Sequence, residues 1–356
     1  MKSKYIILFT LIFVSYTAVY AEKNDTVAFI EYYANDSVAT KGYKNKQNLK
    51  VGQWTWYYMN GKVQSTGEYS DKGWKTGIWQ WFYRDGSLQK QDILSGNGES
   101  KAFYENGKPY YYCKVIDGKK QGQYQEFHKN GKIKMSAVYK DNELDGKAEW
   151  YHANGNKDME GFLKSGKKDG HWIYYYQQNG QKQSEGNFVQ DKEEGAWMYY
   201  YETGEKWREG EYTNGRREGL WKTYYESGDI LHQGSYIHGL EEGVWTSYFD
   251  DGKLQMRGKF KSGKMDGKWE MFNTDGSHKT DVNYSDGLKN GTETLYDENG
   301  NIYQKADYKE GVLNGRWERY FNNKLIEKGT YKDGKKTGKW TFFDESGKET
   351  ESRNFK

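Results

Sequence analysis

A tight-turn glycine recurs about every 24 residues along almost the whole chain, and this spacing limits the chain to a tandem array of small repeats. The glycine usually follows Asn, Asp, Ser or Thr. The turn positions are Gly61, Gly86, Gly107, Gly131, Gly155, Gly180, Gly204, Gly228, Gly252, Gly276, Gly300 and Gly347, with Asn322-Asn323 filling one gap. Because each repeat of an array contacts mainly its neighbours, function should reside in a repeated surface and not in one deep pocket.

The segment from residue 219 to 236 shows what one repeat forms. Strand-forming side chains alternate over residues 221–225, Ser227-Gly228 turns the chain, and residues 230–236 return. Loops such as residues 213–219 join the repeats. Since short connections leave no room for crossover helices, consecutive strands should pair antiparallel. The sequence predicts an all-β fold, an elongated single-layer antiparallel meander of about 14 tandem β-hairpins.

A small residue follows most turn glycines by six positions. The series is Gly67, Gly161, Gly186, Gly210, Gly234, Gly258 and Gly329, with Ala137, Ala306 and Cys113 in the same phase. Glycine weakens a strand, so its recurrence predicts that a Trp or Tyr ring of the adjacent strand lies on it. Another glycine opens each repeat two residues before a large aromatic residue, usually Trp. Two repeats depart from this pattern, because Ser100 and Glu293 take the place of Trp.

The first residues have the features of a cleaved export signal. Lys2 and Lys4 precede an apolar run over residues 5–14, and Val19-Tyr20-Ala21 ends in the small-x-small pattern of a cleavage site. We therefore expect three segments: a signal peptide at 1–21, a degenerate first hairpin at 22–51 and the repeat array at 52–356. The expected location is the periplasm, the cell surface or the medium, without a transmembrane segment after cleavage.

Aromatic residues make up 18% of the chain, whereas the net charge is only +3. A single-layer sheet cannot bury both of its faces, so some rings should meet solvent, a second copy of the chain or a ligand. The candidate interaction face comprises Trp172, Tyr174, Tyr176, Trp197, Tyr199, Tyr201, Trp221 and Trp245. The near-balanced charge does not indicate nucleic acid binding.

Motifs that carry chemistry do not appear in the sequence. It contains no nucleophile elbow, phosphate-binding loop or zinc-ligand spacing. We therefore expect no enzyme activity, catalytic residue, cofactor or metal ion. An acidic residue precedes the repeat-opening glycine six times in a row, at Asp145, Asp169, Glu194, Glu218, Glu242 and Asp266. Carboxylates about 10 Å apart cannot share a calcium ion, so we expect them to be solvated loop charges.

The pattern Gly-x-Tyr-x-x-Gly-x-x-x-Gly-x-Trp-x-x-Tyr, as in residues 210–224, resembles MORN repeats. The similarity is greatest to the bacterial MORN-repeat variant family and extends over nearly the whole mature chain. The resemblance implies an array of hairpins, and arrays of this kind act as scaffolds, dimerising modules, lipid-associated modules or appendages of enzymes. It also implies a possible role as an antitoxin or immunity-like partner of a toxin.

Together these observations predict an exported, non-enzymatic scaffold or adaptor whose aromatic sheet face binds another protein or a second copy of the chain. One alternative is a carbohydrate or cell-wall binding module, because residues 172–180 are also similar to aromatic wall-binding repeats. A second alternative is a toxin-neutralising partner, which rests on the family resemblance alone.

Overall fold

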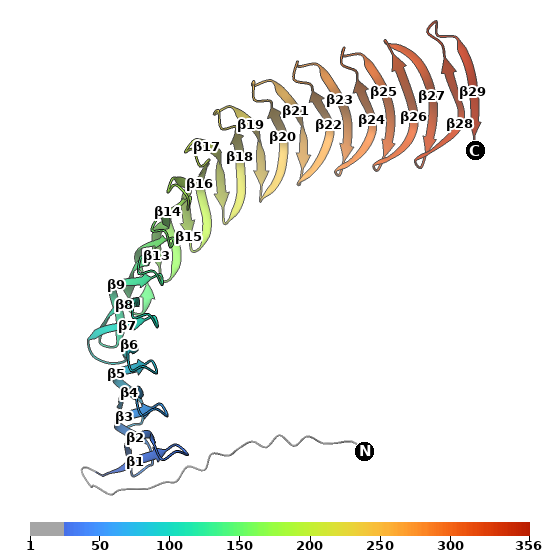
Figure 1. Ribbon diagram of the computed structural model, residues 1–356. Helices are drawn as coiled ribbons and strands as arrows, with labels where there is room; N and C mark the ends of the chain where they lie inside the picture. The colour runs from blue at the N-terminus through green and yellow to red at the C-terminus, as the bar shows by residue number, and fades with distance from the viewer. Residues whose placement is uncertain (1–24) are drawn as a thin grey trace, which may run out of the picture. The chain divides into compact units, whose positions relative to one another are not determined.

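The computed structural model describes residues 25–356, which form 29 β-strands and no helix (Figure 1). The all-β prediction is therefore confirmed for this part of the chain. Because residues 25–356 are free of helix, they contain no helical segment suited to crossing a membrane. The expected signal peptide, residues 1–21, lies outside the described residues.

The chain divides into two compact halves between Asp169 and Gly170. The N-terminal half contains β1 (Thr26–Tyr32), β2 (Val38–Asn45), β3 (Lys50–Tyr57), β4 (Val63–Tyr69), β5 (Lys75–Phe82), β6 (Leu88–Ile93), β7 (Gly98–Phe103), β8 (Pro109–Ile116), β9 (Lys119–Phe127), β10 (Ile133–Lys140), β11 (Glu143–Leu144), β12 (Gly146–Tyr151) and β13 (Lys157–Lys164). The division falls within β14 (Lys167–Tyr175). The C-terminal half continues with β15 (Lys182–Val189), β16 (Lys192–Tyr200), β17 (Lys206–Thr213), β18 (Arg216–Tyr224), β19 (Ile230–Ile237), β20 (Leu240–Tyr248), β21 (Leu254–Lys261), β22 (Lys264–Phe272), β23 (His278–Ser285), β24 (Leu288–Tyr296), β25 (Ile302–Lys309), β26 (Val312–Phe321), β27 (Lys324–Lys332), β28 (Lys335–Phe343) and β29 (Glu349–Phe355).

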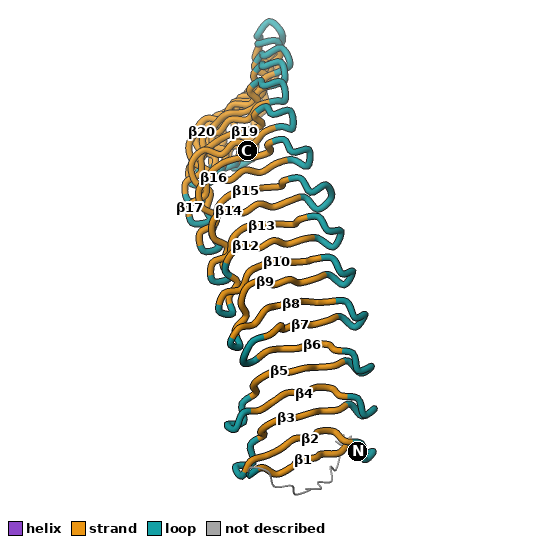
Figure 2. The backbone as a smooth tube through the Cα atoms, turned by 90° about the vertical axis from the view of Figure 1, so that its left-hand side faces the viewer, coloured by secondary structure: helices purple, strands orange, loops and turns teal. Residues whose placement is uncertain are grey.

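Within each half, the strands pair antiparallel with their neighbours in sequence, as β3 does with β4 and β18 with β19. The halves are thus single-layer meanders, and Figure 2 shows the strands of the N-terminal half as successive rungs with turns at both edges. β11 and β12 both pair with β10 and form one strand interrupted at Asp145. β1 and β2 form a hairpin in the segment where the sequence predicts a degenerate first repeat.

The turns that contain the recurring Asn-Gly pairs lie along one edge of the meander. The N–H of Gly61 donates to the carbonyl of Tyr58 at 2.9 Å, and Gly61 has a φ of 80°. Asn60 does not take the left-handed conformation; its side chain accepts the N–H of Lys62 and donates to the carbonyl of Arg84 in the next turn, each at 3.1 Å. The turn at Asn60-Gly61 is therefore a type I turn closed by a left-handed glycine, and its asparagine links it to the following turn.

The turns along the other edge are two-residue hairpins. Asn214 and Gly215 have φ values of 52° and 78°, and Thr213 pairs with Arg216 across them, which defines a type I′ turn. The expectation of a loop over residues 213–219 is therefore wrong. β18 already begins at Arg216 and runs through Gly219, because the strand pairing shifts opposite this glycine instead of ending there.

The acidic residues before the repeat-opening glycines connect these hairpins. A side-chain oxygen of Glu194 accepts the N–H of Asn214 at 2.8 Å, Glu218 accepts that of His238 at 2.8 Å, and Glu242 accepts that of Ser262 at 2.7 Å. Each carboxylate thus binds the left-handed first residue of the next turn. The prediction of solvated charges is therefore incomplete for Glu194, Glu218 and Glu242, since each also satisfies a backbone donor that the turn leaves free.

Candidate functional site: the tryptophan file and its interruptions

Tryptophan rings lie directly on glycines of the preceding strand, along one face of the sheet that we call the Trp face. A Cβ atom placed on Gly210 would stand 2.2 Å from a ring carbon of Trp221, and one on Gly234 would stand 2.1 Å from Trp245. The same contact occurs at Gly42, Gly67, Gly186, Gly258 and Gly329. The predicted contact of a ring with the small residue is confirmed at these positions.

The indole nitrogen has a role of its own at this position. Where the pairing of β17 with β18 shifts, Nε1 of Trp221 donates to the carbonyl of Glu211 at 3.1 Å. Trp54, Trp79 and Trp269 make the same bond at 3.0–3.1 Å to the carbonyls of the residues that follow their glycines. Tryptophan suits this site because its indole combines a large flat ring with an N–H donor on the ring edge.

The tryptophans of the candidate interaction face are buried within this file of rings. Trp172, Trp197 and Trp221 are 0%, 4% and 2% exposed, and Trp245 is half-buried. Tyr212 packs edge-on to Trp221 with their centroids 5.1 Å apart, and the guanidinium of Arg217 lies 5.0 Å from the Trp221 ring. The flanking side chains thus cover the indoles, so a partner approaching the sheet would not meet the three buried tryptophans of the candidate face.

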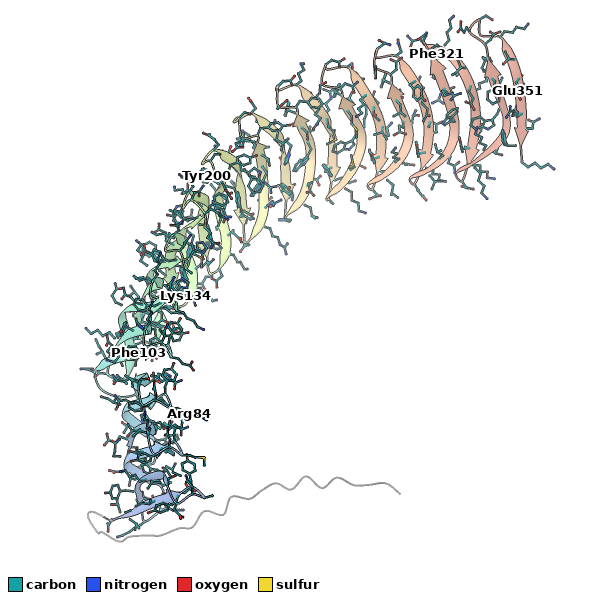
Figure 3. The ribbon with its side chains drawn as sticks, viewed as in Figure 1. Arg84, Phe103, Lys134, Tyr200, Phe321 and Glu351 are labelled. Atoms are coloured by element: carbon teal, nitrogen blue, oxygen red, sulfur yellow. The ribbon has the colours of Figure 1, made fainter. Side chains whose placement is uncertain are left out.

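The tyrosines of the candidate face also make internal contacts. The hydroxyls of Tyr176 and Tyr201 donate at 2.7 Å to the carbonyls of Tyr200 (labelled in Figure 3) and Tyr224, one repeat further on. Tyr174 and Tyr199 lie in the file itself, with centroids 6.4 Å from Trp197 and 6.3 Å from Trp221 respectively. Sequence reasoning missed the turn tyrosines as links between repeats, although Tyr58, Tyr83, Tyr104 and Tyr225 recur three residues before the turn glycine.

The first interruption of the file lies in the N-terminal half, at β7. Ser100 holds the tryptophan position, and Asp92 holds the glycine position on the strand before it. The N–H of Ile93 donates to Oγ of Ser100 at 3.0 Å. Ala102, two residues on, replaces a second ring, since Trp56 and Trp81 occupy that place in the preceding repeats. Both ring positions of this repeat are therefore small.

The loss of tryptophan continues over two more repeats. Tyr124 in β9 and Ala148 in β12 also stand at the tryptophan position, two residues after Gly122 and Gly146. The small residues in front of these positions are Cys113 and Ala137. Cys113 is 1% exposed, and burial raises the pKa of its thiol, which agrees with the packing role predicted for it. The expectation of only two departures from the repeat is therefore wrong.

A recess of about 780 Å³ lies over Ala102 on the Trp face of the N-terminal half. Its walls include the rings of Trp81, Tyr110, Tyr111 and Tyr124 and the side chains of Lys90 and Lys120. Phe103, labelled in Figure 3, contributes from β7. The volume is within the range of about 300–1,000 Å³ that small-molecule sites have.

The second interruption lies in the C-terminal half, at β24. Glu293 holds the tryptophan position between Val282 of β23 and Ala306 of β25, and it is 7% exposed. The ammonium of Lys289 forms an ion pair with its carboxylate. Burial, followed by the neighbouring Glu293 carboxylate, raises the pKa of the Tyr308 hydroxyl to about 12. A charged pair with a neutral phenol thus occupies the tryptophan position.

Glu270, His278 and Asp281 bring possible metal-ligand atoms within 4.8 Å of one another. Two cationic side chains already bind these carboxylates. A hydrogen bond from Arg257, and after it one from Lys268, hold the pKa of Glu270 at about 2 against the effect of burial. The Lys268 ammonium lies 3.0 Å from Glu270 and 3.2 Å from Asp281. The cluster has the charge balance of a structural ion-pair network.

The sequence profile of the MORN repeat variant family matches ten segments, which together cover more than half of the chain. They are residues 50–71, 75–92, 97–115, 120–141, 144–164, 193–214, 217–238, 241–262, 289–310 and 313–333. The chain therefore belongs to the MORN repeat variant family, as its repeat pattern predicts.

The other comparisons found more distant likenesses. None of the curated proteins matches the chain. Among solved structures, crystal structures of TcdB2-TccC3-Cdc42 and TcdB2-TccC3-TEV are similar at 10% and 11% identity with TM-scores of 0.18 and 0.17. Each match covers 92% of this chain and 23% of that one, so this chain spans less than a quarter of their length.

Proposed function

We propose that this protein is an exported, non-enzymatic repeat scaffold or adaptor that binds a partner protein. The observation that carries the proposal is a row of exposed apolar side chains on the face opposite the Trp face. Leu220 is 52% exposed and Val244 is 59% exposed, and each directly precedes a tryptophan of the file, so both point away from it. They are two strands apart, or about 10 Å.

The surroundings of Leu220 have the composition of a protein interface. Ala196 stands at the same position one repeat earlier, and a shallow depression of about 310 Å³ extends over Ala196, Met198 and Leu220. Glu209 and Lys222 border it. An apolar centre within a polar rim is typical of surfaces that bind other proteins. The export part of the proposal rests on the composition of residues 1–21, and the proposed destination is the periplasm or cell surface.

The test is site-specific photo-crosslinking in living cells, with the crosslinking residue placed at Leu220 or at Val244. Both positions should give the same crosslinked protein, and a Leu220→Glu change should abolish the crosslink from Val244. Lys339 provides the matched control, because it occupies the same register position in a repeat with a charged side chain there. Equal crosslinking from Lys339, or capture that survives Leu220→Glu, would refute the proposed surface.

A further inference from the structure

We propose that the recess over Ala102 is a saccharide-binding site, in which sugar rings stack against aromatic side chains and their polar edges meet Lys90 and Lys120. This site is independent of the proposed protein-binding row. It lies on the Trp face of the N-terminal half, whereas Leu220 and Val244 lie on the opposite face of the C-terminal half.

The recess exists because one repeat lacks both of its rings. Ser100 and Ala102 are 4% and 6% exposed and leave a low floor where other repeats carry tryptophan or tyrosine. Trp81 of β5 borders this floor on one side, and Tyr111 and Tyr124 of β8 and β9 border it on the other. The ring of Trp81 on one side and the rings of Tyr111 and Tyr124 on the other thus face a shared space.

The walls supply the apolar faces that a pyranose ring needs. Tyr111 packs against Tyr124 with centroids 6.1 Å apart, and Tyr110 packs against Tyr111 at 5.7 Å. These contacts fix the rings before any ligand arrives, which lowers the conformational entropy lost on binding. Sugar C–H groups are weakly positive and stack favourably on the negative face of an aromatic ring.

The charges at the recess exclude a cationic ligand. The Lys90 ammonium lies 5.2 Å from the Trp81 centroid and 2.7 Å from Asp92. The Lys120 ammonium lies 4.9 Å from the Tyr139 centroid. Two ammonium groups beside these rings repel a cation, so we expect a neutral or anionic ligand.

The polar groups of the recess favour a sugar over a nucleotide. The amide of Gln89 donates and accepts hydrogen bonds, as sugar hydroxyls do, and the hydroxyls of Tyr111 and Tyr124, which donate to Asp92 and Glu126, can each still accept one. Asp92 accepts from the hydroxyl of Tyr111, a lining residue, at 3.2 Å. A nucleotide phosphate carries up to two negative charges and is repelled by the Asp92 carboxylate more strongly than a uronic acid, whose single carboxylate could lie at Lys120. A neutral sugar hydroxyl is not repelled.

The experiment is calorimetric titration of the mature chain with trisaccharides of glucose, N-acetylglucosamine and galacturonic acid. At least one should bind, and Ala102→Trp should raise its dissociation constant by at least about tenfold because the indole fills the recess. Tryptophan already occupies this register position at Trp56 and Trp81, so the change suits the local backbone. Near-UV circular dichroism verifies that the variant is folded.

Ser247→Trp is the matched control, since it adds the same ring at the same register position in a repeat of the C-terminal half that retains its tryptophan, and it should leave saccharide binding unchanged. Failure of all three trisaccharides to bind at millimolar concentration overturns the proposal. Binding that survives Ala102→Trp, or titration with adenosine monophosphate or a tetrapeptide that gives heat where the sugars give none, overturns it as well.

Discussion

The repeats at Ser100 and Glu293 have both lost the tryptophan of the file, yet they differ in what took its place. At Ser100 the position is filled by a small hydroxyl that accepts a backbone N–H, and rings of the flanking repeats face an open recess. At Glu293 the position is filled by a buried carboxylate that Lys289 neutralises and that is hydrogen-bonded to Tyr308. In the Ser100 repeat a small side chain replaced the ring, whereas in the Glu293 repeat an ion pair replaced apolar packing.

Both repeats share a second change one strand earlier. Asp92 and Val282 stand where the intact repeats mostly have glycine. Ala306, which precedes Trp317, is the exception among the intact repeats and still adds only a methyl group. The comparison teaches that the glycine is needed only where a tryptophan ring must lie on it, so the two positions vary together.

The largest expected effect comes from copying the first interruption into an intact repeat. Trp221→Ser should cost about 3–5 kcal/mol, because a buried ring and its hydrogen bond are lost while Gly210 supplies nothing to fill the space. Hydrogen exchange of the amides in β17 to β19 measures this local loss. Leu220→Ser is the control, and its exposed side chain should contribute within about 0.5 kcal/mol. Similar losses for both variants would contradict the role of the ring.

The second prediction places a valine, as at Val282, under a tryptophan that is still present. Gly234→Val should cost about 1–3 kcal/mol, because its Cβ would overlap the ring of Trp245. In a Trp245→Ser background the same valine should cost far less, and the double-mutant cycle gives the coupling. Additive costs would mean that the glycine serves backbone conformation alone.

A variant at the start of β18 provides a reference for that measurement. Glu218→Ala removes the acceptor of the His238 N–H and should cost about 0.5–1.5 kcal/mol, less than Gly234→Val.

The third prediction concerns the ion pair of the second interruption. Lys289→Met should cost about 1–2 kcal/mol, because the Glu293 side chain is 8% exposed and would lose its cation. Adding Glu293→Leu should recover most of that loss, since an apolar pair of similar volume needs no compensation. Equilibrium urea unfolding of the single and double variants tests this. If the double variant is the less stable of the two, the carboxylate has a packing role that leucine cannot meet.

The smallest expected effect is at the first interruption itself. Ser100→Ala should cost about 1 kcal/mol, because the buried N–H of Ile93 loses its acceptor. Ser100→Thr retains the hydroxyl on a β-branched side chain and should restore the stability. Exchange of the Ile93 amide is the readout, and unchanged protection in the alanine variant would show that the hydroxyl does not hold this strand.

Spacing and residue type alone predicted the hairpin array and the contact between Gly234 and a ring, because both depend on local chemistry repeated many times. The location of the type I′ turns was missed because glycine follows Asn, Asp or Ser at both edges, as at Gly61 and Gly215. Only the φ values distinguish them: the residue before the glycine is left-handed at Asn214 but not at Asn60.

Burial of the candidate face could not be read from the alternation of residues. A single-layer sheet has no second layer to cover its rings, but long side chains flank each ring. One of them is Lys75, whose ammonium lies 4.0 Å from the Trp79 centroid. Those side chains cover the indoles without a second layer. The recess was not predicted because it depends on the lack of a ring at both Ser100 and Ala102, together with the rings of neighbouring repeats.

The overlap of ring and glycine also imposes an order on mutation. While Trp245 is present, Gly234 cannot drift to a residue as large as valine, so the tryptophan must be lost first. Once it is lost, the glycine position is free to vary, and a residue such as Asp92 or Val282 then blocks the return of the ring. Each interruption is therefore difficult to reverse, because a single substitution does not restore the tryptophan of a repeat that has lost it. The surface of that repeat can then evolve separately from the rest of the array.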